Sequence, residues 1–232
     1  MALLEQKVAL ITGAKGGLGG HVTEAFLAEG ATVAGVSRSI EASDFSHPRF
    51  AAMPSDLSTG ESANRLAAEV AAKFQRIDAL VHLMGGFEGG HSVHETGDDA
   101  LDRMLDMNLK SAFFMARAVL PYMRKQGGGR IIAIGSRAAA EPSPGAGVYA
   151  ASKAALVSLI LTMAAENKDR SISANILLPG TMDTPANRKS MPGADYAKWV
   201  QPAQVATLAV SLASDKLSQV SGAVIPIYGA EV

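Results

Sequence analysis

The sequence predicts a single doubly wound α/β domain, in which a parallel sheet of seven strands carries helices on both faces. Short runs rich in β-branched residues alternate with longer segments of helical periodicity, as in successive βαβ units. The first run leads directly into a glycine-rich turn and a helix, which is typical of doubly wound sheets. The chain contains no internal repeat, low-complexity tract or linker, so we expect residues 1–232 to form one domain.

The first two expected strands enclose a helix. Residues 7–12 and 32–37 are β-branched runs, and residues 17–29 between them have helical periodicity. Gly30 ends this helix, because glycine commonly follows a helix C-terminus.

The middle of the chain continues the alternation. A short third strand is expected at residues 49–54, a helix at 60–75 and a fourth strand at 79–83. Residues 98–126 form a long amphipathic segment that predicts one helix, which the glycines at 127–129 end.

The last part of the chain supplies three further strands and two helices. The strands are expected at residues 130–134, 171–178 and 223–228, and the helices at residues 148–167 and 202–214. This order predicts a parallel sheet rather than a meander.

Composition limits the classes of function. The 21 basic and 22 acidic residues leave a formal charge of -1, so no strong field attracts nucleic acid or an anionic membrane. Cysteine is absent, which excludes disulfides and thiol catalysis and fits a reducing compartment. Residues 1–8 lack a signal-peptide pattern, and the mostly apolar residues 154–165 are expected to be too few to span a bilayer. We therefore expect a soluble cytoplasmic protein.

A glycine-rich turn follows the first strand with the spacing T-G-x-x-x-G-x-G. It differs from the G-x-G-x-x-G fingerprint and from the phosphate loop that ends in Lys-Ser/Thr. Glycine removes the Cβ that would block a phosphate, and the next helix offers unpaired N–H groups and a positive dipole end. The turn therefore predicts a phosphate-bearing ligand held by Thr12, Gly13, Lys15, Gly17, Leu18 and Gly19.

Tyr149 and Lys153 are four residues apart within an expected helix, so their side chains project from one face. A neighbouring ammonium favours the ionised phenol and would bring the tyrosine pKa down from about 10. Such a tyrosine can exchange a proton with a substrate oxygen.

Taken in order, these motifs resemble the short-chain dehydrogenase/reductase family from about Lys7 to Gly229. The resemblance implies a Rossmann-type fold and a nicotinamide cofactor. The matching catalytic positions are Asn108, Ser136, Tyr149 and Lys153. The matching cofactor positions include the glycine turn, Tyr149 and Lys153. The others are Asp56 and Leu57 at the adenine, Gly85 and Gly86 after the fourth strand, and Pro179, Gly180 and Thr184 at the nicotinamide.

The resemblance also implies a mechanism of hydride transfer between the cofactor and a carbonyl or alcohol. Ser136 would orient the substrate oxygen, and Tyr149 would act as the general acid/base. Lys153 would lower the tyrosine pKa and bind the ribose, while Asn108 would help to hold a water that relays protons.

The end of the second strand favours NADP(H) over NAD(H). An NAD enzyme normally carries Asp or Glu about 20 residues after the glycine turn, to bind the ribose 2′-hydroxyl. Here Ser37 and Arg38 occupy that place, and a guanidinium pairs with a 2′-phosphate. Lys15 adds positive charge nearby.

Two segments depart from the family pattern. His82-Leu83-Met84-Gly85 stands where most members carry N-N-A-G, and we interpret His82 as structural. The glycine-rich residues 85–90 and the lid-like residues 181–199 resemble dihydropteridine reductase, a member of the same superfamily. Two features argue against the identity of this chain with that enzyme. Dihydropteridine reductase lacks a serine at the position of Ser136, and it prefers NADH, which does not fit Ser37-Arg38.

Three functions therefore stay open. The first is an NADP-dependent carbonyl reductase or alcohol dehydrogenase, with 3-oxoacyl thioesters among its candidate substrates. The second is a reductase of dihydropterins or related heterocycles, and the third is a non-catalytic NADP sensor, which would not need the Ser136 and Tyr149 pair. No metal site is expected, because His91 and His94 lack a third ligand at a fixed spacing. The family also implies a homodimer or homotetramer formed through the helices at 98–126 and 148–167.

Overall fold

All seven strands described by the computed structural model join one parallel sheet, in the order β3-β2-β1-β4-β5-β6-β7. The structure describes residues 2–230, so both ends of the expected 1–232 domain lie outside the described residues. The strands are β1 (Val8–Thr12), β2 (Thr32–Val36), β3 (Phe50–Ala52), β4 (Ala79–His82), β5 (Gly129–Ile134), β6 (Ile172–Pro179) and β7 (Val224–Ile227). The predicted doubly wound class is confirmed.

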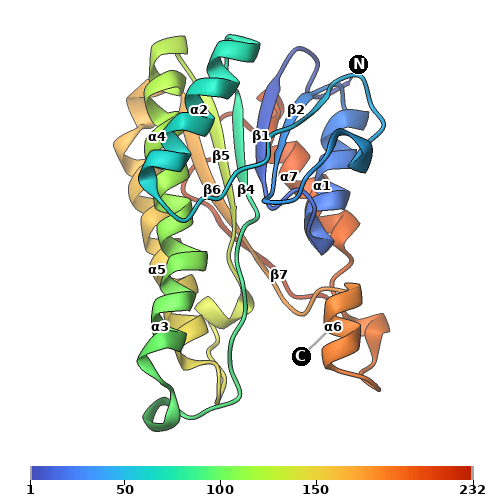
Figure 1. Cartoon of the computed structure of the whole chain (residues 1–232), viewed down its shortest axis with the longest axis vertical. Coiled ribbons are helices and arrows are strands. Elements are labelled where there is room, and N and C mark those ends of the chain that lie inside the picture. The colour runs from blue at the N-terminus through green and yellow to red at the C-terminus, as the bar shows by residue number, and fades with distance from the viewer. Residues whose placement is uncertain (1, 231–232) are drawn as a thin grey trace.

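Helices cover both faces of this sheet (Figure 1). The helices are α1 (Gly17–Ala28), α2 (Gly60–Phe74), α3 (Asp98–Leu105), α4 (Ser111–Gln126), α5 (Gly147–Glu166), α6 (Pro185–Ser190) and α7 (Pro202–Ala213). Figure 1 shows α1 and α7 on one face and α2, α4 and α5 on the other. The strand order reverses between β1 and β4, which opens a crevice at the carboxyl ends of the central strands.

Two hydrophobic cores, one on each face, hold the layers together. Successive side chains of a strand point to opposite faces. Leu10 therefore packs with α2, α4 and α5, while the next residue, Ile11, packs with α1 and α7. Both side chains are fully buried, as expected for a parallel strand covered on both sides.

The long helix expected at residues 98–126 is not continuous. A π-helical turn at Asp106–Lys110 separates α3 from α4. The Ser111 hydroxyl donates to the Met107 carbonyl oxygen at 2.7 Å inside this turn. Widened turns of this kind are frequent at functional sites, and this one carries Asn108.

The apolar stretch expected at residues 154–165 lies within helix α5. Helix α5 has 20 residues, and by length and composition alone it could cross a membrane. Its buried side chains, Leu156 and Ile160 among them, instead belong to the core beneath the sheet. The helix is therefore a core element of the fold.

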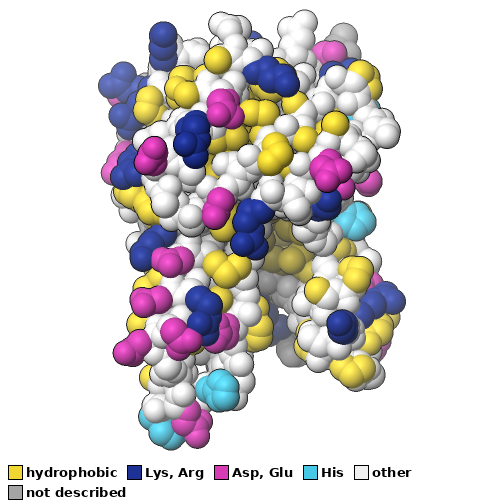
Figure 2. All heavy atoms as spheres, in the orientation of Figure 1, with side chains coloured by type: hydrophobic (Ala, Val, Ile, Leu, Met, Phe, Trp, Pro, Cys, Tyr) yellow, Lys and Arg dark blue, Asp and Glu magenta, His cyan; other side chains and the backbone are white. Residues whose placement is uncertain are grey.

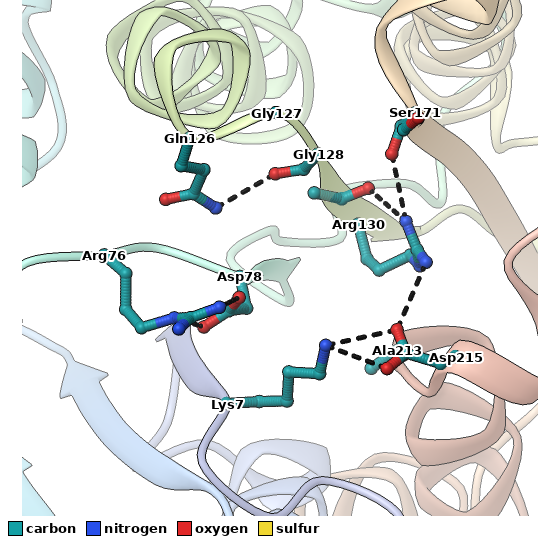
Figure 3. A pocket seen from close by; sticks show the side chains of 11 residues that line it. Lys7, Arg76, Asp78, Gln126, Gly127, Gly128, Arg130, Ser171, Ala213 and Asp215 are labelled. Carbon is teal, nitrogen blue, oxygen red and sulfur yellow. Dashed lines mark hydrogen bonds and ion pairs between the residues drawn. The ribbon is translucent and has the colours of Figure 1, made fainter.

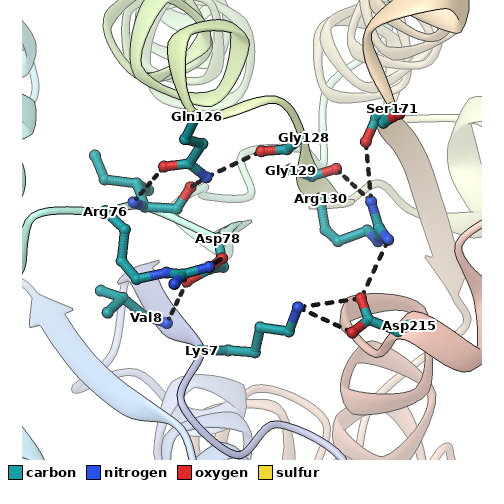
Figure 4. A network of polar contacts seen from close by, with 11 residues as sticks. Lys7, Val8, Arg76, Asp78, Gln126, Gly128, Gly129, Arg130, Ser171 and Asp215 are labelled. Carbon is teal, nitrogen blue, oxygen red and sulfur yellow. Dashed lines mark hydrogen bonds and ion pairs between the residues drawn. The ribbon is translucent and has the colours of Figure 1, made fainter.

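Ion pairs join the amino ends of the central strands (Figures 3 and 4). Asp215, just after α7, pairs with Lys7 before β1 and with Arg130 on β5, at 3.0 and 3.4 Å. Asp78 accepts from the Val8 amide at 2.8 Å and binds Arg76 through two contacts of 2.6 Å. These groups line a cavity of about 240 Å³. Helices α2, α4 and α7 end here, and their partial negative charges favour cations, so the cluster stabilises the fold.

Candidate active site

The carboxyl ends of β1, β4, β5 and β6 bring the expected site residues to one edge of the sheet. Figure 2 shows the molecule hollowed below this edge, between the lobe that holds α3 and the lobe that holds α6. This edge lies at the opposite end of the strands from the ion-pair cluster. Ligands of doubly wound sheets bind at such a position.

The glycine turn after β1 is shaped for close approach. Gly13 has φ +70, and a Cβ on Gly19 would lie 2.0 Å from the Gly13 carbonyl oxygen, so both positions need glycine. A Cβ on Gly17 would lie 3.2 Å from Thr184, which places the turn beside the segment after β6. Within residues 2–230, α1 begins without a side-chain cap, and its first turn holds no acidic residue. Its positive end therefore suits the diphosphate of a dinucleotide.

A chain of buried hydrogen bonds connects β1, β4 and the π-turn. The Thr12 hydroxyl accepts from the Leu83 and Met84 amides and lies 3.0 Å from His82 Nδ1. His82 Nε2 lies 3.2 Å from the Ser111 hydroxyl, whose own proton goes to the Met107 carbonyl oxygen. These partners assign the neutral imidazole with its proton on Nε2, donating to Ser111. Burial, and secondarily the charge of Lys153, lowers the His82 pKa to about 3.

Asn108 holds the loop after β4 in place through its side-chain amide. Its Oδ1 accepts from the Gly86 amide at 2.9 Å, and its Nδ2 donates to the Gly86 carbonyl oxygen at 3.1 Å and to Ser152 at 3.0 Å. A Cβ on Gly85 would lie 2.7 Å from Asn108 Oδ1 and 3.2 Å from Lys153 Nζ. The Asn108 side chain is thus occupied by the loop, with Lys153 close to the same glycine.

Ser136, Tyr149 and Lys153 meet where β5 ends against α5. Ser136 lies beside Tyr149 and lowers the tyrosine pKa, while burial raises it by more, so the pKa of Tyr149 lies above its ordinary value. Lys153, predicted to lower this pKa, is not among the causes of the shift. Instead, the Lys153 ammonium donates to the Ile134 carbonyl oxygen at 2.9 Å, and burial lowers its own pKa to about 8.

The residues expected at the adenosine lie around the end of β2. Arg38 is exposed and Ser37 half-buried. Lys15 pairs with Asp44 at 2.9 Å and donates to the Ser39 carbonyl oxygen at 3.0 Å. This pair holds the Asp44 pKa below its usual range and neutralises the cation that was expected to add positive charge.

Asp56 and Leu57, also expected at the adenosine, follow β3. Asp56 accepts from the Ser58 amide at 3.1 Å, and Leu57 is buried in the core.

The lid-like segment is ordered by its own contacts. Arg188 binds Asp183 through contacts of 2.5 and 2.8 Å and stacks on Tyr196. Tyr196 in turn packs against Trp199, which is buried. The guanidinium of Arg188 is thereby neutralised, and Trp199 is part of the core.

Sequence reasoning missed three features of the site. Phe87 lies within the glycine-rich residues 85–90 without being singled out there, but the Phe87 ring meets the Tyr149 ring edge-on at 4.9 Å. Sequence reasoning did not single out Asp44 or Ser111. Residue 44 carried no signal, whereas the replacement of the family asparagine by His82 pointed to a new polar contact for that buried position.

Comparison with known proteins decides the family. A sequence model of the short chain dehydrogenase family matches residues 7–195. The chain belongs to the short-chain dehydrogenase family. Members are oxidoreductases that bind NAD(P)(H) and act on small molecules.

Three members with similar chains illustrate the range. A 3-oxoacyl-[acyl-carrier-protein] reductase FabG of Thermotoga maritima is 33% identical, over 97% of this chain and 98% of its own. The structure of a 3-ketoacyl-(acyl-carrier-protein) reductase from Brucella melitensis, complexed with NADH, has a TM-score of 0.87 and 26% identity, covering 97% of this chain and 98% of that one. The structure of ElxO with NADP bound has a TM-score of 0.90 and 25% identity, with 96% and 97% covered. One of these structures therefore holds NADH and the other holds NADP.

Proposed function

We propose that the protein transfers hydride between NADP(H) and a carbonyl or alcohol substrate, with Tyr149 as general acid/base. The placement of Ser136, at the end of β5, beside Tyr149 on α5 at the carboxyl edge of the sheet carries this proposal. Two hydroxyl groups at one point can donate together to a single oxygen atom. Lys153 lies one helical turn from Tyr149, with a pKa of about 8.

The residues of the chain would act on the proton and the charge. When bound, the nicotinamide supplies or accepts the hydride. Ser136 orients the substrate oxygen and stabilises the negative charge that grows on it, and Tyr149 gives it a proton. A raised pKa keeps Tyr149 protonated at neutral pH, as a proton donor must be. Lys153 can gain or lose a proton near neutral pH and would pass protons toward Tyr149.

The glycine turn and the start of α1 would hold the diphosphate, and Asp56 and Leu57 would border the adenine. Lys153 would bind the ribose, and Pro179, Gly180 and Thr184 would border the nicotinamide. The bare positive end of α1 and the contact of Gly17 with Thr184 support this arrangement.

Arg38 supports the preference for NADP(H). It is exposed at the end of β2, and no carboxylate stands at residue 37 or 38 to repel a 2′-phosphate. Fluorescence titration should give a dissociation constant for NADPH at least about tenfold below that for NADH, and Arg38→Ser should remove most of this difference. Tighter binding of NADH by the unaltered protein would overturn the preference.

The reaction itself is tested by following NADPH oxidation with a panel of substrates. The panel contains ketones, a 3-oxoacyl thioester, chosen because of the Thermotoga relative, and a quinonoid dihydropterin. We expect carbonyl reduction, and Tyr149→Phe should lower kcat by roughly 10² to 10⁴ with NADPH affinity unchanged. Turnover of the dihydropterin alone would favour the heterocycle reductase, and NADPH binding without any turnover would favour a sensor.

We also propose a cytoplasmic homodimer or homotetramer without nucleic-acid or membrane partners. The near-zero net charge supports the absence of such partners. Phe113 on α4 and Leu161 on α5 are 42% and 38% exposed, which supports assembly through these helices. Light scattering on the eluted protein measures the number of subunits.

A further inference from the structure

Phe87 is a large apolar side chain left open to solvent beside the candidate proton donor. It is 69% exposed, although an aromatic ring is normally buried to a large extent. Its ring meets Tyr149 edge-on, with ring centroids 4.9 Å apart and an interplanar angle of 74°. The ring is therefore available to a molecule that places its carbonyl at Tyr149.

The loop around Phe87 is fixed on both sides. Gly86 exchanges two hydrogen bonds with Asn108, and Glu88 binds Arg103 through contacts of 2.7 and 2.9 Å. Gly90 donates to the Gly145 carbonyl oxygen at 2.8 Å. A Cβ on Gly89 would lie 2.9 Å from Phe87 Cζ, so the ring folds over this glycine. An exposed ring in a restrained loop is prepared for binding, because little conformational freedom remains to be lost.

The surroundings of the ring are apolar or neutralised. Val93, on the same lobe, is 78% exposed, and Met191, next to α6 on the other lobe, is 41% exposed. The carboxylate of Glu88 is paired with Arg103. Figure 2 shows the hollow between these two lobes. The residues on both sides of this hollow can therefore contact an apolar group. Residues 86–88 add no unpaired charge there.

We infer that Phe87 determines substrate specificity, selecting carbonyl compounds that carry a bulky apolar group, such as an aryl group, next to the carbonyl. The inference rests on the proposed function, because it places the reacting carbonyl at Tyr149. Contact with the ring stabilises the bound substrate and the transition state alike. Its loss therefore raises KM more than it lowers kcat.

Phe87→Ala tests this inference with two ketones that differ only in size, an aryl methyl ketone and a small dialkyl ketone. We expect kcat/KM for the aryl ketone to fall by about 10- to 100-fold, mainly through KM, and that for the small ketone to change less than about twofold. Phe87→Leu should recover part of the loss. The control is Val224→Ala, which removes an exposed apolar side chain at the start of β7, at the opposite end of the sheet from Tyr149, and should change neither value.

The outcomes separate the inference from the proposed function. Equal effects of Phe87→Ala on both ketones, or none, would overturn the role of Phe87 while leaving carbonyl reduction intact. If the unaltered protein reduces no ketone, the proposed function fails first. An independent readout is the tyrosinate absorbance of Tyr149, obtained by difference from Tyr149→Phe. Phe87→Ala uncovers the phenol, so the pKa of Tyr149 should fall, and an unchanged pKa would contradict the contact on which the inference depends.

Discussion

At the residue scale, Lys153 keeps a charged group inside the protein at the expense of stability. Lys153 is 5% exposed, and burial lowers its pKa from 10.5 to about 8. Folding at neutral pH must therefore bury a proton-bearing amine. Lys153→Met should raise the free energy of unfolding at pH 7 by roughly 1–3 kcal/mol while abolishing turnover.

The sign of the pH dependence provides the check on Lys153. Between about pH 8 and 10.5 the unfolded lysine is protonated and the folded one is not, so the unaltered protein gains stability as the pH rises. The advantage of Lys153→Met should shrink over this range. Urea unfolding on either side of pH 8 measures it, and a variant that is less stable at pH 7 would show that the Ile134 contact outweighs the buried charge.

His82 makes the stability of the folded protein sensitive to acidic pH. It is 2% exposed, and its pKa of about 3 lies far below the ordinary 6.5. As the pH falls below 6.5 the unfolded state takes up a proton that the folded state refuses, so stability falls by up to about 1.4 kcal/mol per pH unit. His82→Asn should flatten this loss between pH 6.5 and 4, in unfolding curves recorded at each pH. An unchanged slope would mean that other groups cause the acid sensitivity.

At the scale of elements, the π-turn between α3 and α4 depends on one hydroxyl. Ser111 donates to the Met107 carbonyl oxygen and accepts from His82. Ser111→Ala leaves the buried His82 N–H without its acceptor, which should lower the free energy of unfolding by about 1–3 kcal/mol. It should also reduce kcat, because the turn positions Asn108 and, through it, the loop at Gly86.

Thr162→Ala on α5 is the matched control for the π-turn. Thr162 likewise donates to a carbonyl oxygen four residues earlier, that of Ser158 at 2.9 Å, but it is exposed. Its loss should change stability by less than about 0.5 kcal/mol and leave kcat unaltered. A Ser111→Ala variant that behaves like this control would contradict a positioning role for the turn.

Local patterns predicted the elements well and their irregularities poorly. The strands and the glycine turn follow from short runs and from the need to omit Cβ at Gly13 and Gly19. Periodicity predicts one helix across the π-turn. His82 and Ser111 are 29 residues apart, so their contact leaves no periodic signal in the sequence. For the same reason, the spacing of four residues pairs Lys153 with Tyr149, whereas the Lys153 ammonium binds the end of β5.

At the scale of the whole molecule, the ion pairs that stabilise the fold and the candidate active site lie at opposite ends of the sheet. The carboxyl ends of the strands carry the candidate site, and the amino ends carry the ion pairs of Asp78 and Asp215 (Figure 4). Asp78 is the best buried of these carboxylates, with 11% of its side chain exposed, and it accepts from both Arg76 and the Val8 amide. Its loss would leave a backbone N–H at the start of β1 unpaired.

Asp78→Ala should therefore lower the free energy of unfolding by about 2–4 kcal/mol while leaving kcat/KM within about twofold, at temperatures where the variant is folded. Asp169→Ala is the control at the same end of the sheet. Its pair with Arg170 is 72% and 59% exposed on the two side chains, so its loss should change stability by less than about 1 kcal/mol. Urea unfolding and initial-rate kinetics on the same preparations measure both quantities. A large loss of kcat/KM in folded Asp78→Ala would mean that the two ends of the sheet are coupled, and the cluster at its amino ends would then belong to the working site.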